Sequence, residues 1–394
     1  MSPKEATAFL IDLNLTVDQY LAIRSESREH GHDWLPPYAV VLEAKKEAYP
    51  DNITVTETGA EVDLQSLLHH AGTGIVEQLI AEGVIENVGE LVGYTLVLKG
   101  GFDATHVTEF NQKCLDPEPV RFQYLKETKA ICKREADYLR GKMKEVQILE
   151  VNGCQIDFEM ISSMVDGKVC NFLNNSSSQR CFVCKETISK FNDIELVVVK
   201  QVDETQINNG LTVMHTRIRS MELVLYIAER LVLPKRIYKV PKALKPVTKK
   251  EGRRIQQCLK SRIGVVVNKP KPGFGNTNSG NTARKFFKNC DIVAEITGFD
   301  VRLLVRIATI LGVISCGEVV NIGAFREYGI DTARRFVEFY DWYYMPTTLH
   351  LILIHGYLFL RKLDPAMGLY SEEPLESSHK VLKSYRNHRA RRCD

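Results

Sequence analysis

The sequence predicts a protein of mixed α/β and α class, in which a short group of β-strands lies between two largely helical regions. Apolar residues recur at helical spacing over the first eighty to ninety residues and again after about residue 210. Between these regions, the runs YTLVLKGGFD, VQILEVNG and CQIDFEMISSMVD have the composition or the alternation of strands. At roughly 150 residues per domain, a chain of 394 residues corresponds to two or three packed units.

The N-terminal region begins with a well-marked helix, LTVDQYLAIRSESREHG. Thr16 can cap its start together with Gln19, three residues later, and Gly31 can adopt the left-handed conformation that ends a helix. The runs Val40–Ala48 and Val62–Ile80 also show apolar residues at helical spacing. We therefore expect the region before the strands to be mainly helical.

Two of the predicted strands end in an aspartate. Asp103 follows YTLVLKGGF, and Asp166 follows CQIDFEMISSMV. Phosphodiester cleavage by two Mg²⁺ ions needs three converging carboxylates that hold the ions about 4 Å apart, and strand ends plus one helix can supply them. Strand-end position alone does not single out Asp103, Asp166 and Glu376, because the chain has 49 acids and most acids are simply solvated.

The C-terminal half is predicted to be helical over Leu211–Leu233 and Ala294–Leu363, where the apolar runs are too long for strands. The segment Lys235–Lys288 between them is different, because it contains sixteen Lys or Arg residues and a single acid, Glu251. Lys and Arg neutralise phosphates, so this composition favours an anionic polymer as partner. A solvated face and an acidic protein partner remain alternatives.

A second candidate site combines two cysteines with two distant histidines. Cys181 and Cys184 have the C-x2-C spacing of a zinc knuckle, and His350 and His355 have an H-x4-H spacing that also occurs in zinc sites. From spacing alone, a chance or redox-active cysteine pair is as good an interpretation as half of a metal site. The histidines are equally well explained as core residues of an apolar helix.

Composition excludes several classes of protein. Apolar residues make up 44% and charged residues 26%, which is ordinary for a globular protein and too apolar for a disordered one. We expect no membrane span and no secretory signal, because no run approaches about 18 apolar residues and Met1–Leu15 lacks the signal pattern. Ten cysteines scattered along a long chain argue against a disulfide framework, so an intracellular protein is expected.

Several segments, taken together, resemble the Transib family of DNA transposases. They are PPYAVVLEAKKEAYP, AEVDLQSLLHH, PVRFQYLKETKAI, MVDGKVCNFLNNSSSQRCFVC, NKPKPGFGNTNSGNTARKFF, MPTTLHLILIHG and LYSEEPLESSHKVLKSYRNHRARR. The resemblance runs in order from about Leu10 to Arg392, and the same scaffold is similar to the catalytic core of the vertebrate V(D)J recombinase. It implies an RNase H-like catalytic fold interrupted by a large zinc-bound helical insertion.

The resemblance implies the catalytic carboxylates of a DDE enzyme. By position, the family's two aspartates fall on Asp103 and Asp166, and its glutamate falls on Glu376, which comes just before the small-residue and Lys run that opens a helix. Glu372 and Glu373 are the competing choices for the third carboxylate. These acids would hold Mg²⁺, or Mn²⁺, as the catalytic cofactor.

The resemblance also implies a zinc site and a DNA-binding surface. The family's zinc ligands fall on Cys181, Cys184, His350 and His355. His215 matches a histidine that helps to position the scissile phosphate, although a buried structural role explains it equally well. The expected DNA-binding residues are Lys235, Arg236, Lys249, Lys250, Arg253, Arg254, Arg284, Lys285, Lys380 and Arg386.

In this interpretation the chain has six regions. Residues 1–35 form a helical dimerisation and DNA-binding region, 36–93 a pre-catalytic helical region and 94–176 the RNase H-like part. Residues 177–213 hold the zinc-binding cysteines, 214–370 form the helical insertion with the histidines, and 371–394 form the last catalytic helix. The family's further DNA-binding region before LIDLNL and its tail after RNHRARR have no counterpart here, so we expect weaker recognition of terminal repeats.

The activity that the resemblance implies is cutting at terminal inverted repeats. One strand is nicked, the freed 3′-hydroxyl forms a hairpin on the flanking DNA, and the excised 3′ ends are joined to target DNA. Expected partners are double-stranded DNA and a second copy of the chain, and the expected location is the nucleus. Two alternatives remain: a domesticated, non-catalytic DNA-binding protein on the same scaffold, and a zinc-stabilised interaction protein.

Overall fold

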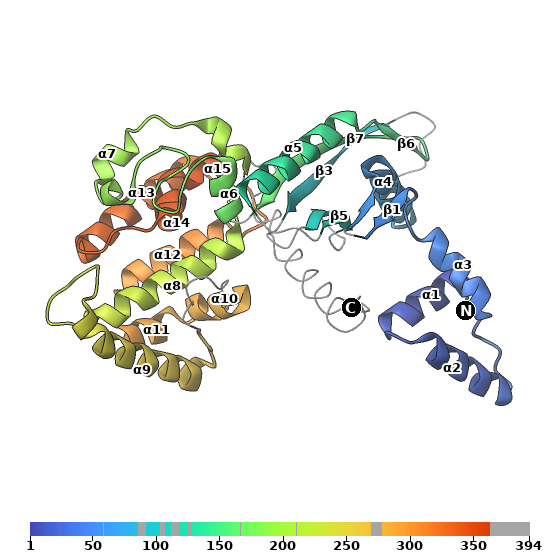
Figure 1. The fold of residues 1–394 in the computed structure, drawn as a ribbon, viewed down its shortest axis with the longest axis horizontal. Helices are drawn as coiled ribbons and strands as arrows, with labels where there is room; N and C mark the ends of the chain where they lie inside the picture. The colour runs from blue at the N-terminus through green and yellow to red at the C-terminus, as the bar shows by residue number, and fades with distance from the viewer. Residues whose placement is uncertain are drawn as a thin grey trace. The chain divides into compact units, whose positions relative to one another are not determined.

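The protein is mixed α/β and mostly helical (Figure 1). A computed structural model describes residues 1–57, 59–85, 92–102, 107–111, 118–123, 128–165, 167–209, 211–268 and 278–362. The chain divides into two compact units: Met1–Leu96 with Lys142–Phe158 form unit 1, and Val97–Gly141 with the described residues from Glu159 onward form unit 2. Among the described helices, none is both long and apolar enough to cross a membrane.

Unit 1 begins with three short helices around a small core. They are α1 (Pro3–Asp12), α2 (Val17–Glu29) and α3 (Tyr38–Glu47). The predicted cap of α2 is confirmed: the Thr16 hydroxyl accepts from the Gln19 N–H at 3.2 Å, and the Gln19 side chain accepts from the Thr16 N–H at 2.8 Å. Gly31 follows the helix at φ +82°, the left-handed conformation that glycine adopts without strain. Tyr20 is fully buried in this core.

A β-hairpin interrupts the region that the sequence predicts to be mainly helical. Strands β1 (Ile53–Thr56) and β2 (Gly59–Val62) pair antiparallel, with Ile53 opposite Val62. Helix α4 (Leu64–Ala81) follows at once, and the Asp63 side chain caps it by accepting from the Ser66 N–H at 3.0 Å. The hairpin was missed because both strands have only four residues and all of β1 is exposed, so no apolar alternation marks them.

The predicted strands are present, with two more between them. The strands are β3 (Val92–Phe102), β4 (Val107–Asn111), β5 (Glu118–Gln123), β6 (Leu149–Val151) and β7 (Cys154–Val165), and helix α5 (Lys129–Glu145) lies between β5 and β6 in sequence. Neighbouring strands follow the order β5-β4-β3-β7-β6. The pairs β3–β4, β4–β5 and β6–β7 are antiparallel.

Strands β3 and β7 are neighbours in the sheet. In β3 the residues up to Leu96 belong to unit 1 and those from Val97 to unit 2, and in β7 the change falls between Phe158 and Glu159.

The rest of unit 2 is a helical body around one large core. Its helices are α6 (Gly167–Leu173), α7 (Ile194–Val198), α8 (Val213–Leu231), α9 (Lys245–Ile263), α10 (Gly280–Lys288), α11 (Cys290–Thr297), α12 (Val301–Val313), α13 (Ile322–Tyr340), α14 (Thr347–His350), the π-helical turn η4 (Leu351–His355) and α15 (Gly356–Lys362), with 3₁₀ turns η1 (Ile188–Lys190), η2 (Glu204–Asn209) and η3 (Lys242–Leu244). Helix α8 packs against α9, α10, α11, α12 and α14, whereas α13 packs against η4 and α15.

Candidate metal centre

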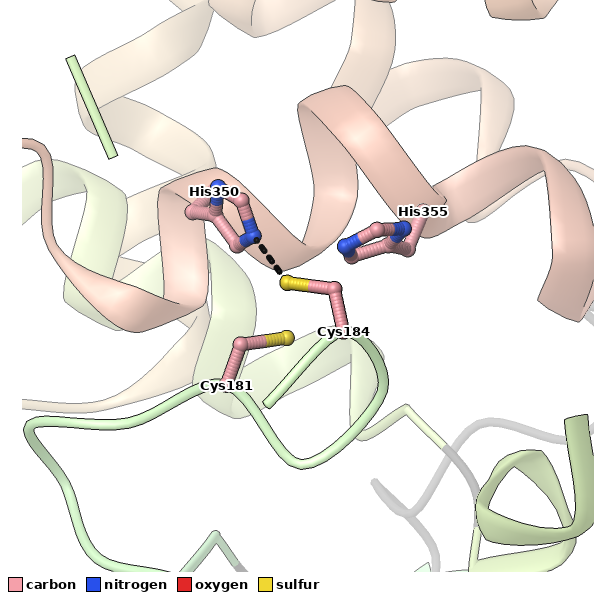
Figure 2. Close-up of side chains that lie close together, drawn as sticks. All are labelled: Cys181, Cys184, His350 and His355. Carbon is pink, nitrogen blue, oxygen red and sulfur yellow. Dashed lines mark hydrogen bonds between the residues drawn. The ribbon is translucent and has the colours of Figure 1, made fainter. Parts of the chain in front are cut away.

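Four metal-ligating side chains meet inside unit 2. The ligand atoms of Cys181, Cys184, His350 and His355 all lie within 4.8 Å of one another, and all four residues are buried, none more than 2% exposed. Figure 2 shows the two cysteines on one tight turn, facing the two histidines of a helical segment. The Cys184 sulfur lies 3.4 Å from His350 Nε2. The structure thus brings together two pairs that are far apart in the sequence.

The cysteine side of the cluster is a turn whose shape depends on its backbone. The Cys181 N–H donates to the Glu186 carbonyl at 2.8 Å, and Arg180 and Thr187 form an isolated antiparallel bridge around the turn. Lys185 adopts a left-handed conformation, at φ +59°, directly after the second cysteine. Closing the chain in this way directs both sulfurs to the same side, which is the shape that a C-x2-C zinc knuckle requires.

The histidine side depends on a change of helix type. In an α-helix, two residues five positions apart point in directions that differ by about 140°, so an H-x4-H pair cannot share one ion without distortion. Here His350 ends α14 and His355 ends the π-helical turn η4, whose wider turn brings positions five apart to nearly the same side. The two rings lie 5.0 Å apart between centroids, in an edge-to-face arrangement.

Contacts between the two halves of the cluster hold it closed. Asn192, in the segment after the cysteine turn, accepts from the Met345 N–H at 2.9 Å and donates to the Tyr343 carbonyl at 3.0 Å. The ring of Phe191 stacks on that of His350 with centroids 3.9 Å apart. These contacts fix the segment that precedes α14 against the segment that follows Cys184.

The electrostatics of the cluster favour a cation. The hydrogen bond between the two cysteine side chains lowers the pKa of Cys184 well below its ordinary range, and the same contact, together with burial, raises the pKa of Cys181. Burial lowers the pKa of His350, which keeps that imidazole neutral and able to donate a lone pair. The negative charge therefore concentrates on Cys184, beside the neutral imidazole of His350.

The cluster fits a tetrahedral metal ion such as zinc. Among the described residues, His355 Nε2 is buried without a hydrogen-bond partner, an arrangement that a metal bond would satisfy. A zinc ion with bonds of about 2.0–2.3 Å separates its ligand atoms by about 3.3–3.8 Å, so small side-chain rotations would close the observed cluster around an ion. Four protein ligands in a buried site leave no open position for a substrate, which is typical of a structural metal.

The three predicted catalytic carboxylates, Asp103, Asp166 and Glu376, lie outside the described residues, as do Lys380 and Arg386. His215 lies in the first turn of α8 and is half-buried. This position is compatible both with a structural role and with positioning of the scissile phosphate.

The predicted DNA-binding residues of Lys235–Lys288 that the structure describes are all exposed. Three of them are nevertheless engaged within the protein. Arg254 donates to the Glu251 carboxylate at 2.6 Å and to the Ile296 carbonyl at 2.7 Å. Arg236 donates to the Leu231 carbonyl, and Arg284 donates to the Asn281 side-chain oxygen at 2.9 Å. The charge composition of the sequence does not distinguish arginines that are hydrogen-bonded within the protein from cations that are available for DNA.

Sequence analysis did not identify the residues that support the cluster. Asn192 and Phe191 have no motif, and the only signal for η4 was the H-x4-H spacing itself, which suits a π-helical turn better than an α-helix.

No protein-family model matches the chain, and no curated protein matches its sequence.

Proposed function

We propose that the protein is a metal-dependent DNA transposase of the DDE type, with an RNase H-like catalytic sheet. The observation that carries the proposal is that β3 and β7 are neighbours in one sheet, and the residues that follow them in the sequence are Asp103 and Asp166. In the proposal these two strands run parallel, so that both acids hold the same metal ions, with Glu376 as the third carboxylate.

In this proposal, Mg²⁺ ions held by Asp103, Asp166 and Glu376 supply charge stabilisation at the scissile phosphate and activation of the attacking hydroxyl. The protein's own residues bind and orient the DNA. Mutual repulsion of three carboxylates makes the site depend on cations, because like charges a few ångströms apart cost free energy when nothing neutralises them.

The buried Cys–His cluster is proposed to hold a structural zinc ion. The cysteines precede α7 and the histidines follow α13, so one ion would join the two ends of the helical body that lies between them. Such an ion contributes to folding rather than to phosphodiester chemistry. The same proposal includes a homodimer, since two transposon ends have to be paired, and a nuclear location.

The decisive test compares cutting with binding. We would measure Mg²⁺-dependent nicking, hairpin formation and DNA binding by the full chain on terminal-repeat duplexes. Asp103→Asn, Asp166→Asn and Glu376→Gln should each abolish nicking and hairpin formation while binding persists, because all three acids are proposed to serve one metal centre.

Glu372→Gln and Glu373→Gln are the matched controls and should remain active. If Glu376→Gln cuts normally and one of these controls does not, the third carboxylate is misassigned. If the unmodified chain bound the DNA but did not nick it, the protein would instead be a domesticated, non-catalytic DNA-binding protein.

A further inference from the structure

Helix α9 (Lys245–Ile263) has one buried face and two exposed flanks that differ in charge pairing. Its buried residues are Thr248, Gly252, Ile255, Leu259 and Ile263, which face the core of unit 2. On one flank the arginines are paired: Arg254 with Glu251 on the same helix, and Arg262 with Glu295 on α11 at 2.8 Å. The paired flank therefore stabilises the packing of α9 beside α11.

The other flank carries cations without acids. At about 100° per residue, Lys249, Arg253 and Lys260 point within about 40° of one another, well away from both paired arginines. All three are exposed, and among the described residues no carboxylate lies within ion-pairing distance of them. Lys245 and Lys250 lie on the two sides of this row and are also exposed and unpaired among those residues. We call Lys249, Arg253 and Lys260 the cationic row.

The chemistry of this flank suits phosphate better than a protein surface. Beside the cationic row, on the side of Lys250, helix α9 exposes Pro246 and the amide side chain of Gln257, and no aromatic or large aliphatic side chain of α9 lies on this flank. Protein interfaces are centred on buried aromatic and apolar anchors and are depleted in lysine, whereas contacts to the DNA backbone come from Lys, Arg and amide side chains.

The row is long enough to follow a nucleic-acid strand. Lys249 and Lys260 are eleven residues apart, which corresponds to about 16 Å along the helix axis, against about 3.4 Å per nucleotide along one strand of a duplex. Beyond the end of α9, the Lys285 ammonium of α10 lies beside Gly264, the residue that caps α9. The positive charge thus extends from α9 to α10.

We propose that the cationic row of α9 is a contact surface for the phosphate backbone of double-stranded DNA, whereas Arg254 and Arg262 serve the fold. The inference rests on the proposed function for its choice of DNA as the polyanion. It differs from that function in what it predicts, because it concerns binding that needs neither Mg²⁺ nor the carboxylates. Contacts to phosphate should not depend on base sequence.

The test uses the full chain in the presence of a chelator of Mg²⁺. In the triple variant Lys249→Gln, Arg253→Gln, Lys260→Gln, affinity for a terminal-repeat duplex and for an unrelated duplex should fall equally, by about tenfold or more. The slope of log affinity against log salt should become shallower by about two to three units. Lys249→Arg with Lys260→Arg should bind normally.

The matched control removes the same charge elsewhere: Arg302→Gln, Arg334→Gln, Arg361→Gln. These arginines are exposed on α12, α13 and α15 and pair with Asp300, Glu195 and Glu204. A thermal melt of each variant would show that the fold is kept. Equal weakening of binding in the control and the row variant would overturn the proposal, since net charge alone would then explain the effect.

Two further outcomes separate this inference from the proposed function. If the row variant binds and nicks DNA like the unmodified chain, the row is not a DNA contact although the transposase proposal stands. If the row variant loses DNA binding but the unmodified chain never nicks with Mg²⁺, the row stands and the transposase proposal fails. A row variant that keeps DNA binding and loses binding to a polyglutamate peptide would overturn the inference in favour of an acidic protein partner.

Discussion

The metal cluster and the cationic row of α9 are both concentrations of charged or metal-binding side chains within unit 2, and they differ in burial. In the cluster, two thiols and two imidazoles are withdrawn from water, so their charges and lone pairs have to be satisfied inside the fold. In the row, Lys249, Arg253 and Lys260 remain solvated and need no partner for the protein to fold. Polar and ionisable side chains thus specify the fold where they are buried and remain available for binding where they are exposed.

The comparison predicts opposite effects of substitution in the two regions. Loss of a ligand in the cluster should unfold the helical body and affect DNA binding only through the fold. Loss of charge in the row should weaken DNA binding and leave stability nearly unchanged.

Removing a metal ligand should have the largest effect. For Cys184→Ser, or after treatment with a strong zinc chelator, we expect a loss of unfolding free energy on the order of 5 kcal/mol, since structural zinc contributes directly to folding. Zinc content and thermal melting would measure it. Cys258→Ser, at a half-buried cysteine on α9 outside the cluster, is the control. A protein that melts normally after Cys184→Ser would contradict the structural role.

A methyl group added at Gly329, where α13 packs against η4, should have the next largest effect. A Cβ atom at Gly329, on α13, would lie 2.5 Å from the Leu353 carbonyl oxygen in η4, which is too close for the two backbones to keep their positions. We expect Gly329→Ala to cost about 2 kcal/mol and to weaken zinc binding as η4 shifts.

The control is Gly312→Ala on α12, where no atom lies within 4 Å of the added methyl and alanine should be neutral or slightly stabilising. Chemical denaturation would compare the two variants. Equal stabilities would show that the contact between α13 and η4 does not constrain the metal site.

Acidification should have a smaller effect, in which the affinity for the metal falls gradually with pH. Because the pKa of Cys181 is raised, binding of an ion displaces a proton from this thiol, and affinity should fall about tenfold for each pH unit lowered, or about 1.4 kcal/mol. The pKa of His350 is lowered in the fold, so the stability that depends on its neutral form is present above its ordinary pKa and is lost as pH falls below it.

The loss of metal should therefore steepen below about pH 6.5, the ordinary pKa of histidine. Competition with a chromogenic chelator across the acidic range would measure it. An affinity independent of pH would show that these groups do not bind the ion.

Substitution of the cationic row should have the smallest effect on stability. We expect each of the substitutions Lys249→Gln, Arg253→Gln and Lys260→Gln to change the unfolding free energy by no more than about 0.5 kcal/mol. Exposed side chains without close partners contribute little to folding. Arg254→Gln, which breaks a pair with Glu251 and a hydrogen bond to the Ile296 carbonyl, should cost more than any of them. Chemical denaturation would measure these losses. If Arg254→Gln cost less unfolding free energy than a substitution in the cationic row, the two flanks of α9 would not differ in their contribution to the fold.

Local sequence signals predicted the elements that depend on local chemistry. The capping box of Thr16 and Gln19, the helical runs and the strands before Asp103 and Asp166 follow from caps and apolar periodicity. The hairpin of β1 and β2 was missed because it is exposed, short and without alternation. Helix α9 was not recognised within the basic segment, because its few buried residues, such as Ile255 and Leu259, are outnumbered by Lys and Arg.

By itself, the sequence determined which side chains could form a metal site and where positive charge would gather, because ligand type, spacing and composition are properties of the chain. Only the tertiary structure decided that Cys184 meets His350 across 166 positions, and only the π-helical turn decided that His355 faces the same point. It also decided that Arg254 donates to the Ile296 carbonyl of α11, whereas Arg253, the preceding residue, has no acidic partner among the described residues. The physical reason is that burial and pairing depend on neighbours brought together by packing, and adjacent residues of a helix point about 100° apart.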